Sequence, residues 1–278
     1  MRSTEQRQVE HNIRVHDRIA RTYEERHGEI YNEIEQERLH RMLECACGNI
    51  RTDSEPKTAL DLGCGSGNLT DHLIQLGLHT VAADVSDRFL RRVWQQFSPT
   101  NKLEVLKLNG NDLSNIEDAS FDLAVTYSVL HHVPDYLGIV SEMVRVLKPG
   151  GIIYIDHEVN EGYWKQDSEY AAFRKSFRRA RHAQAGWTRH FHLYRYRDGL
   201  GKLFKLFGPR WYSAQGDIHV WPDDHVEWAK VEHCLTSHDC EIILKQNYLL
   251  YRRGCPIELY RRYEDRFSDM CVLIGRKK

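Results

Sequence analysis

The sequence has little of what marks non-globular or membrane-spanning chains. Only 18 glycines and 7 prolines occur among 278 residues, which excludes a collagen-like or low-complexity chain. No run of 18 apolar residues is present, so we expect no transmembrane helix. The first 30 residues are too charged for a secretory signal peptide, which favours a cytoplasmic location. With 41% hydrophobic and 28% charged residues, the composition is that of a soluble globular protein.

Neither sign of charge is in excess, and the cysteines form no metal-binding spacing. The 39 Lys and Arg residues nearly balance the 40 Asp and Glu residues, for a net charge of -1. Such a chain has no overall attraction to nucleic acid or to an anionic membrane. The seven cysteines are odd in number and contain no C-x2-C pair. We therefore expect reduced thiols and no bound metal.

The length fits about two domains, or one large domain with an insertion, at roughly 150 residues per domain. Residues 1–50 carry apolar residues at helix-like spacing amid charge, which predicts a helical cap. Residues 51–158 alternate short apolar strands with helices and form the predicted cofactor-binding core. Residues 159–215 break the alternation as an inserted lid, and residues 216–278 complete the core sheet.

The alternation of strands and helices predicts an α/β fold with a doubly wound, mostly parallel seven-stranded sheet of the Rossmann-like kind. Strands are expected at 58–62, 79–85, 103–108, 121–128, 152–156, 241–250 and 270–275. Asp135 is expected to cap a helix that the LKPGG segment at 147–151 ends. Another helix is expected from Asp223 to Leu235.

A glycine-rich turn follows the first strand in the segment ALDLGCGSGN. Gly63, Gly65 and Gly67 permit positive φ angles and a close approach of a ligand to backbone N–H groups at a helix start. Asp84 ends the next strand, where a carboxylate can accept hydrogen bonds from ribose hydroxyls. The spacing is G-x-G-x-G and not the dinucleotide pattern G-x-G-x-x-G. The turn and the acid alone still leave a nicotinamide-dependent dehydrogenase open.

Four segments, of which the glycine-rich turn is the first, carry a family resemblance. LDLGCGSG, AADVS, SFDLAVTYSVLHHVPD and RVLKPGG, within 57–156, resemble the consecutive motifs of class I S-adenosylmethionine-dependent methyltransferases. The group to which they are most similar includes the ubiquinone- and menaquinone-biosynthesis-like methyltransferases of small molecules. VHDRIARTYEERH resembles the family's short helix before the core, where an aromatic residue closes over the cofactor. The resemblance implies S-adenosyl-L-methionine as the cofactor.

The resemblance also implies a set of cofactor-binding residues at the strand ends and in the cap. Gly63, Gly65 and Gly67 would form the loop under the methionine and ribose, and Asp61 would help to hold the methionine amino group. Asp84 would bind the ribose, Val85 would contact the adenine ring, and Asp112, or secondarily Asn111, would bind the adenine edge. Ser128 would line the sulfonium side, and Tyr23 would cover the methionine end.

Histidines supply the candidate catalytic groups. In related enzymes the second histidine of a pair after the fourth strand can act as a base, which points to His132. His157 ends the fifth strand at the same edge of the sheet and is the second candidate. The alternative for His131 and His132 is packing against, or capping of, the following helix. A polar cluster in GDIHVWPDDHVEW, at 217–225, could ligate a divalent metal, but no spacing rule singles it out, and capping by Asp223 is the plain alternative.

The lid is strongly basic. Between residues 165 and 210 there are 12 Lys and Arg against 3 Asp and Glu. Arg178, Arg179 and Arg181, interleaved with aromatic residues, are expected to bind an anionic acceptor, because guanidinium groups form paired hydrogen bonds with carboxylates and phosphates. His219 is assigned to the same acceptor site. The alternative is a solvated helix face.

These observations predict an enzyme that moves a methyl group to an oxygen or nitrogen of a small, anionic metabolite. The protein would align the nucleophile and remove a proton. A tRNA or other nucleic-acid methyltransferase is disfavoured, because no RNA-binding module is visible and Thr126-Tyr127-Ser128-Val129 stands where many such enzymes carry an NPPY-type segment. A non-catalytic cofactor-binding subunit stays open, as does assembly into a homodimer.

Overall fold

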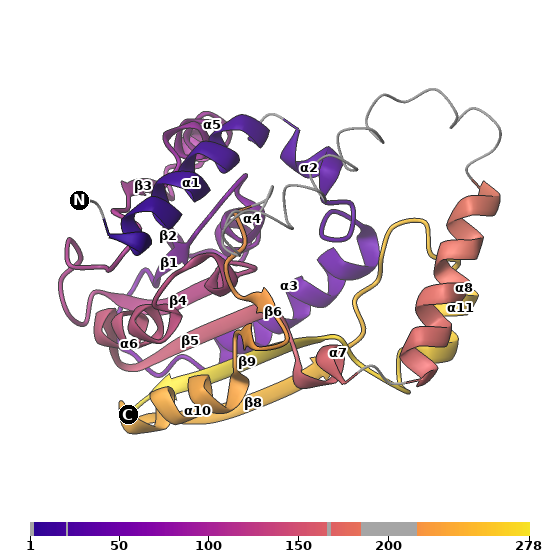
Figure 1. The fold of residues 1–278 in the computed structure, drawn as a ribbon. Coiled ribbons are helices and arrows are strands. Elements are labelled where there is room, and N and C mark those ends of the chain that lie inside the picture. The colour runs from indigo at the N-terminus through magenta and orange to yellow at the C-terminus, as the bar shows by residue number, and fades with distance from the viewer. Residues whose placement is uncertain (1–2, 21, 166–167, 185–215) are drawn as a thin grey trace.

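The fold is that of a computed structural model, which describes residues 3–20, 22–165, 168–184 and 216–278. A single seven-stranded sheet lies at its centre (Figure 1), with the strand order β3-β2-β1-β4-β5-β9-β8. The strands are β1 (Thr58–Leu62), β2 (His79–Asp84), β3 (Leu103–Lys107), β4 (Phe121–Tyr127), β5 (Leu147–Val159), β8 (Cys240–Tyr248) and β9 (Met270–Lys277).

The sheet confirms the predicted fold class. Strands β1 to β5 are parallel, and β9 runs antiparallel to both of its neighbours, β5 and β8. The helix before the LKPGG segment ends at Val146, as expected, but the fifth strand begins at Leu147 and not at 152, so that this segment lies within β5. The strand starts early because Leu147 pairs with Phe121 of β4. A second, two-stranded sheet is formed by β6 (Val220–Trp221) and β7 (Asp224–His225).

Helices cover both faces of the sheet. On one face lie α3 (Glu33–Gly48), α4 (Asn68–Gln75) and α5 (Asp87–Phe97); on the other lie α6 (Tyr136–Val146) and α10 (Trp228–Ser237). The predicted cap of α6 is present, since Asp135 Oδ1 accepts a hydrogen bond of 2.9 Å from Gly138 N. The last of these helices begins at Trp228 and not at Asp223, because β6 and β7 occupy the preceding residues.

The core follows from the central position of β4. All seven of its residues are buried, as expected of a parallel strand that is covered on both faces. Leu123 and Val125 pack in the cluster under α3 and α4, whereas Ala124 packs in the cluster under α6 and α10. The polar edge of this sheet, where the parallel strands end, is therefore the part of the core left for a ligand.

The N-terminal segment closes over that edge. Helix α1 (Thr4–Ile19) starts with a capping box between Ser3 and Gln6, and α2 (Tyr23–Arg26) follows. Ser86, which caps α5, donates a hydrogen bond of 2.5 Å from Oγ to Asp17 Oδ1. This contact and the packing of α1 beside α5 place α1 at the ends of β1 and β2 (Figure 1).

The other described helices are short or lie away from the sheet. They are η1 (Ser98–Thr100), η2 (Leu130–His132), α7 (Glu161–Trp164), α8 (Ser168–Gln184) and α11 (Ile257–Tyr263). Helices α8 and α11 stand side by side at one end of the molecule (Figure 1), held by a buried cluster that includes Tyr170, Phe173 and Tyr260. Among the described helices, none has the length and apolar character needed to cross a membrane.

Candidate active site

Two adjoining cavities open at the carboxyl ends of the parallel strands. The first has about 850 Å³ of empty space, including its open mouth. It is lined by Val9, Asn12, His16, Tyr23, Leu62, Gly63, Gly65, Asp84, Val85, Phe89, Leu108, Gly110, Asp112, Leu113, Tyr127, Ser128, Val129, His132, Val133 and Ile139. We call it the cofactor cavity.

The glycine turn forms the floor of the cofactor cavity at the end of β1. Gly63 has a φ of +72°, and a Cβ added there would lie 2.5 Å from Val129 Cγ2. The turn therefore needs glycine for both backbone conformation and space. Gly67 is the N-cap of α4 and does not line the cavity; a Cβ there would lie 2.7 Å from Phe97. Gly67 thus shapes the turn from behind.

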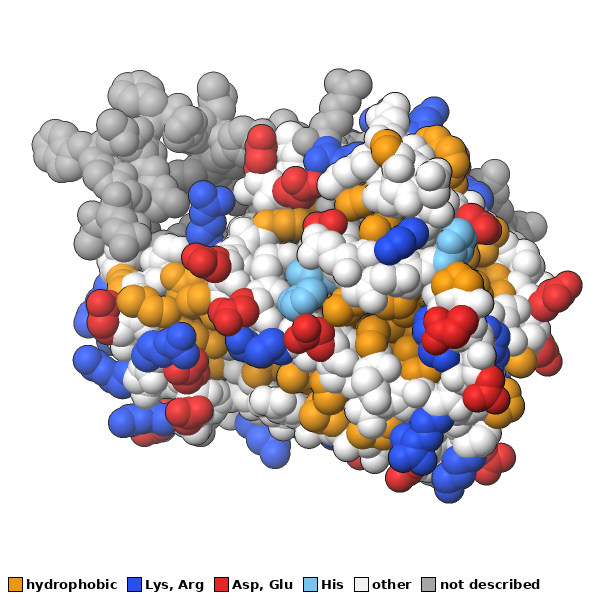
Figure 2. All heavy atoms as spheres, turned by 180° about the vertical axis from the view of Figure 1, so that it is seen from behind, with side chains coloured by type: hydrophobic (Ala, Val, Ile, Leu, Met, Phe, Trp, Pro, Cys, Tyr) orange, Lys and Arg blue, Asp and Glu red, His pale blue; other side chains and the backbone are white. Residues whose placement is uncertain are grey.

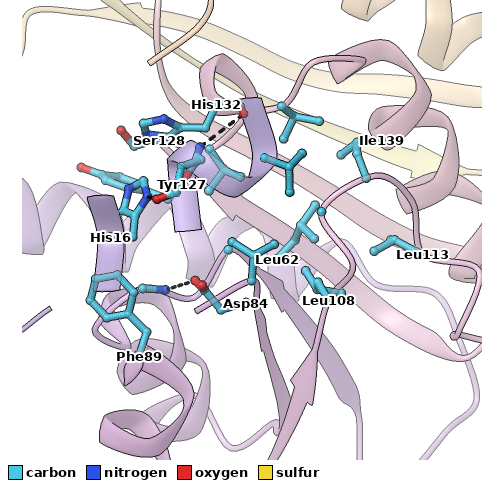
Figure 3. A pocket seen from close by; sticks show the side chains of 18 of the residues that line it. His16, Leu62, Asp84, Phe89, Leu108, Leu113, Tyr127, Ser128, His132 and Ile139 are labelled. Atoms are coloured by element: carbon cyan, nitrogen blue, oxygen red, sulfur yellow. Dashed lines mark hydrogen bonds between the residues drawn. The ribbon is translucent and has the colours of Figure 1, made fainter. Parts of the chain in front are cut away.

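Asp84 places a carboxylate beside the glycine turn. Its Oδ2 accepts a hydrogen bond of 3.0 Å from Gly65 N, and its Oδ1 accepts one of 2.7 Å from Ser86 N. The side chain is buried, and burial raises its pKa above the ordinary value, against the lowering effect of these two donors. Figure 3 shows Asp84 at the cavity wall with the bond from Gly65.

The cofactor cavity is polar at one end and apolar at the other. Figure 3 shows His16, Ser128 and His132 gathered on one side and Leu108, Leu113 and Ile139 on the other. Val85 lines this cavity too. The cavity therefore suits a ligand with a charged or polar end and a flat apolar end.

Of the two residues predicted to hold the adenine edge, Asp112 is the one that lines the cavity. Its Oδ1 accepts hydrogen bonds from Asn109 Nδ2 at 2.7 Å and from Ser114 Oγ at 2.6 Å. Asn111 is exposed and does not line the cavity. Gly110, with a φ of +84°, lies against α1, since a Cβ there would be 2.5 Å from Val9.

Asp61 is placed behind the cavity wall. It is buried, its Oδ2 accepts a hydrogen bond of 2.6 Å from Thr70 Oγ1, and it does not line the cavity. Burial raises its pKa to about 7. The structure therefore does not bring Asp61 to the cavity surface. Asp61 instead supports the glycine turn through its hydrogen bond with Thr70 of α4.

The second cavity lies beside the first and is rich in histidine. It is lined by His16, Ile19, Tyr23, His27, Glu29, Ile30, Ser128, His131, His132, His157, Glu158, Val159, Asp217, His219 and Val220. We call it the acceptor cavity. Four residues line both cavities: His16, Tyr23, Ser128 and His132. These shared residues mark the passage between the two spaces, and Ser128 holds its place there with a φ of +60°.

His131 and His132 lie in η2, directly after β4. His131 Nδ1 is 2.8 Å from Glu158 Oε2, and Glu158 Oε1 also accepts from Leu130 N at 2.8 Å. Burial alone would lower the pKa of His131, but Glu158, and secondarily Asp217, raise it to about 9. The pKa of His132 is held well below its ordinary value by burial and by the neighbouring His131 and His16. The two adjacent imidazoles therefore have opposite electrostatic environments.

Asp217 approaches both rings of this pair. Its Oδ1 lies 4.0 Å from His131 Nε2 and 3.7 Å from His132 Nδ1. The His132 Nδ1 atom is buried and has no hydrogen-bond partner among the residues that the structure describes. The backbone fixes this approach, because Ile218 N and His219 N both donate to the His131 carbonyl, at 2.9 and 3.1 Å.

His157 also lines the acceptor cavity and has a strained backbone conformation. Its φ is +64°, at a bulge where the register between β5 and β9 shifts. The imidazole stacks on Tyr127 with ring centroids 4.5 Å apart. Its Nδ1 lies 3.9 Å from Glu35 Oε1 of α3 and 3.5 Å from the Tyr248 hydroxyl. Strained non-glycine residues that persist in a fold often mark functional positions.

A buried charged network supports His157 from behind. Arg38 donates from Nε to Glu35 Oε2 at 3.0 Å and from Nη2 to Asp156 Oδ2 at 2.9 Å. Tyr248 Oη donates to Asp156 Oδ1 at 2.9 Å. Burial alone would raise the pKa of Glu35, but hydrogen bonding to His157 and the charge of Arg38 lower it below its ordinary value. Glu35 is therefore a carboxylate facing His157.

Of the arginines predicted to bind the acceptor, Arg178 and Arg179 do not line either cavity. Arg178 and Arg179 are exposed on α8, whose apolar side packs in the cluster with α11. The side chain of Arg181 lies outside the described residues, as do residues 185–215 of the lid. His219 does line the acceptor cavity, and its Nδ1 is 2.5 Å from Asp224 Oδ1. The polar cluster at 217–225 is thus divided, with Asp217 turned toward η2 and Asp224 toward His219.

Several cavity residues escaped the sequence-based prediction. Asn12 and His16 of α1 line the cofactor cavity, and Glu29 lines the acceptor cavity. Asn12 Nδ2 also donates to the His132 carbonyl at 3.4 Å. The segment VHDRIARTYEERH, which resembles a cofactor-closing helix, contains His16 but neither Asn12 nor Glu29. The resemblance singles out only Tyr23, because an aromatic residue is what it predicts there.

Comparison with known proteins identifies the core. Residues 60–155 match a family described as "Methyltransferase domain". A ubiquinone biosynthesis O-methyltransferase from Albidiferax ferrireducens is 30% identical over 97 residues, which are 34% of this chain and 38% of that protein. One with the same name from Methylococcus capsulatus is 24% identical over 176 residues, 62% of this chain and 74% of that protein. The first of these matches spans well under half of the relative.

Solved structures give the same fold. A methyltransferase in complex with the Haloferax volcanii Trm112 methyltransferase activator aligns with a TM-score of 0.54 and 16% identity, covering 96% of this chain and 97% of that chain. The comparisons bear out the predicted family: residues 60–155 are a class I S-adenosylmethionine-dependent methyltransferase domain.

Proposed function

We propose that the whole chain is an S-adenosylmethionine-dependent methyltransferase that acts on an oxygen or nitrogen of a small acceptor. The observation that carries this proposal is the pair of cavities joined by His16, Tyr23, Ser128 and His132. One cavity has the glycine turn and carboxylate of a nucleoside site. The other has the imidazoles and carboxylates that can orient an acceptor and receive its proton. A methyl group would cross between them.

The residues of the cofactor cavity fit S-adenosylmethionine. Asp84 would accept hydrogen bonds from the ribose hydroxyls, Val85 and Leu108 would pack on the adenine ring, and Asp112 would hold the adenine edge. Gly63 and Gly65 would lie under the methionine and ribose, with Tyr23 over the methionine end. When bound, the cofactor would supply an activated methyl group on a sulfonium. What this chain must add is alignment and proton removal.

We assign proton removal to His157, the second of the two histidine candidates. It lines the acceptor cavity with the Glu35 carboxylate facing its Nδ1, an arrangement that orients an imidazole. His132 lines the passage, but its lowered pKa makes it a weaker base. Its proposed role is contact with the acceptor. His219 would contribute a further polar group to the acceptor cavity.

The charge of the acceptor is a separate part of the proposal. The sequence predicts an anionic acceptor held by Arg178, Arg179 and Arg181. Among the described residues that line the acceptor cavity there is no Lys or Arg, whereas Glu29, Glu158 and Asp217 are present. An anionic acceptor would thus need a positive charge from a group other than Arg178 or Arg179. A small hydroxyl-bearing acceptor fits the lining without that need.

Two alternatives remain as outcomes of experiment. Acidic and basic side chains are interspersed over the face in Figure 2, which gives no support to a nucleic-acid substrate. The likeness to a chain solved with a methyltransferase activator leaves a partner-dependent activity as the second alternative. We also propose a cytoplasmic location, which the seven free thiols support.

Mass analysis of the products formed from a metabolite extract and methyl-labelled S-adenosylmethionine tests the proposal. The purified chain should transfer label to a low-mass acceptor and release S-adenosylhomocysteine. Label that appears only on RNA would favour the nucleic-acid alternative. Label that appears only after a second protein is added would favour the partner-dependent one.

A further inference from the structure

We propose that His131, His132 and Asp217 form a binding site for one divalent transition-metal ion on the wall of the acceptor cavity. The three ligand atoms, His131 Nε2, His132 Nδ1 and a carboxylate oxygen of Asp217, lie within 4.8 Å of one another. The cysteine and histidine spacings of the sequence predict no metal. The proposal replaces that expectation because the fold brings together residues that are far apart in the chain.

The spacing of these atoms suits a shared cation better than direct hydrogen bonds. The distances of 4.0 and 3.7 Å from Asp217 Oδ1 to the two ring nitrogens exceed hydrogen-bond length. Ligand atoms at about 2.0–2.2 Å from a tetrahedral ion are about 3.4 Å apart. The two Asp217 distances exceed this separation by about 0.3 and 0.6 Å. Because all three atoms lie within 4.8 Å of one another, binding a common ion would draw them together by at most about 1.4 Å.

The His132 Nδ1 atom gives an independent reason. It is buried and has no hydrogen-bond partner among the described residues. Leaving a buried polar atom unsatisfied costs about 1–3 kcal/mol, so such atoms usually have a partner that the protein alone does not show. Nδ1 lies 3.7 Å from Asp217 Oδ1 and within 4.8 Å of the His131 ligand atom, so an ion held between the three residues would supply that partner.

Glu158 provides the support that metal-binding histidines usually have. Its Oε2 lies 2.8 Å from His131 Nδ1, while its other oxygen is held by Leu130 N. With the proton on Nδ1 shared with Glu158, the Nε2 atom is the one left to face Asp217. A carboxylate behind a ligating imidazole fixes its tautomer and strengthens it as a ligand. Glu158 is itself buried, so this orientation is firmly held.

The donor set indicates the kind of ion. Two imidazole nitrogens and one carboxylate oxygen favour zinc, iron, manganese or cobalt over magnesium or calcium, which prefer oxygen ligands. Three protein ligands leave at least one position open. Since all three residues line the acceptor cavity, the open position faces that cavity. An oxygen of the acceptor would occupy it.

This inference rests on the proposed function for its chemical meaning. A metal-bound hydroxyl group ionises more easily, so the acceptor atom would be oxygen and not nitrogen. The described residues that line the acceptor cavity include no Lys or Arg, and the ion would supply the positive charge in their place. The substrate class is therefore a hydroxyl compound, and an anionic one is accommodated without the lid arginines.

The competing explanation is a proton in place of the ion. An imidazolium at His131 between Glu158 and Asp217 would also balance charge at this place. It predicts no stoichiometric metal binding, and it leaves His132 Nδ1 without a partner.

The test is metal binding by the full, tag-free chain after it has been stripped with a chelator. Zn²⁺ alone is titrated against a chromophoric chelator, and Co²⁺ is then used to record the visible absorption of the bound ion. We expect one ion per chain, with a Co²⁺ spectrum typical of nitrogen and oxygen ligands. Intense thiolate charge-transfer bands would place the ion on the cysteines and overturn the proposal.

Variants locate the site. Asp217→Asn and Glu158→Gln should each weaken Zn²⁺ binding at least tenfold, as loss of a ligand or of its supporting carboxylate does. His27→Gln, a histidine of the same cavity outside the cluster, should bind like the unmodified chain. Circular dichroism melting checks that each variant is folded. Asp217 is partly exposed, so the Asp217→Asn variant should keep its fold.

The outcomes separate this inference from the proposed function. Absent binding, or an Asp217→Asn variant that binds as tightly as the unmodified chain, overturns the metal site whatever the activity. Because neither cofactor nor acceptor takes part in the titration, a chain that binds the ion but transfers no methyl group would overturn the proposed function and leave the metal site standing.

Discussion

The imidazole of His157 faces the carboxylate of Glu35, with 3.9 Å between Nδ1 and Oε1. The two residues come from β5 and α3, and each is buried. Arg38 and Tyr248 hold the carboxylate and the imidazole from the protein side. The acceptor cavity therefore has a histidine with a fixed partner, in addition to the pair in η2.

Replacement of this histidine should impair turnover without impairing cofactor binding. For His157→Gln we expect turnover to fall at least about a hundredfold, the lower end of a typical general acid–base contribution. Affinity for S-adenosylhomocysteine, measured by calorimetry, should stay within a few-fold. A loss of activity below about fivefold would return the role of base to His132.

The N-terminal segment should be needed for activity but not for the sheet. Deletion of residues 1–28 removes α1 and α2, including His16 and Tyr23 of the passage, while Leu39 and Leu43 keep α3 on the core. We expect turnover to vanish, because water then enters the site, with the secondary structure retained in circular dichroism. A truncated chain with full turnover would show that the segment is not a closing element.

A matched pair of glycines tests how closely α1 packs on the cofactor cavity. Gly110 and Gly77 both have positive φ, at +84° and +93°, but a Cβ at Gly110 would lie 2.5 Å from Val9 and one at Gly77 would meet nothing within 4 Å. Each alanine variant should lose about 1–2 kcal/mol of stability from backbone strain. Only Gly110→Ala should also weaken S-adenosylhomocysteine binding, by about tenfold. Equal affinities in the two variants would argue against this packing.

Asp122 should make stability depend on acid. It is fully buried and accepts hydrogen bonds from Ser54 Oγ at 2.7 Å, Thr58 N at 2.7 Å and Lys148 Nζ at 3.1 Å. Burial alone would raise its pKa, but the hydrogen bonds from its neighbours lower it well below the ordinary value. A lowered pKa stabilises the fold above the unfolded value, about 3.9, and this stability is lost as pH falls toward the folded value.

The corresponding variant isolates that contribution. Asp122→Asn should lose about 1.5–3 kcal/mol at pH 7, the worth of hydrogen bonds to a charged group. Denaturant unfolding from pH 7 to pH 3 should show the gap between the two chains closing as pH falls. A gap that is constant with pH would mean that the charge of Asp122 contributes nothing.

The part of the site that can be predicted from the sequence is the part formed by a continuous stretch of chain. The run from Ala59 through the glycine turn defines β1, the turn and the start of α4, which is why Gly63, Gly65 and Asp84 can be predicted as cavity residues from the sequence alone. Distant contacts are not predictable in this way. Asp217 approaches His131, which lies 86 residues earlier in the chain. Glu35 approaches His157, which lies 122 residues later.

The lid shows the same limit in another way. Phe173 and Phe177 are spaced to pack one face of a helix, and that face turns α8 toward α11, which leaves Arg178 and Arg179 in solvent. The basic composition of the lid suggests a pocket lined by cations. Composition carries no information on which face of the helix is covered, so it cannot predict that these arginines are exposed. The division of the chain into a cap, a core, a lid and a completing segment stays a prediction.

The most direct test of the account is calorimetric titration of the chain and its Asp84→Ala variant with S-adenosylhomocysteine. The buried carboxylate beside Gly65 should hold the ribose through paired, charge-assisted hydrogen bonds. We predict one binding site in the unmodified chain, more than about tenfold weaker binding in Asp84→Ala, and no binding of NAD to either. Unchanged affinity in the variant, or preference for NAD, would contradict the account.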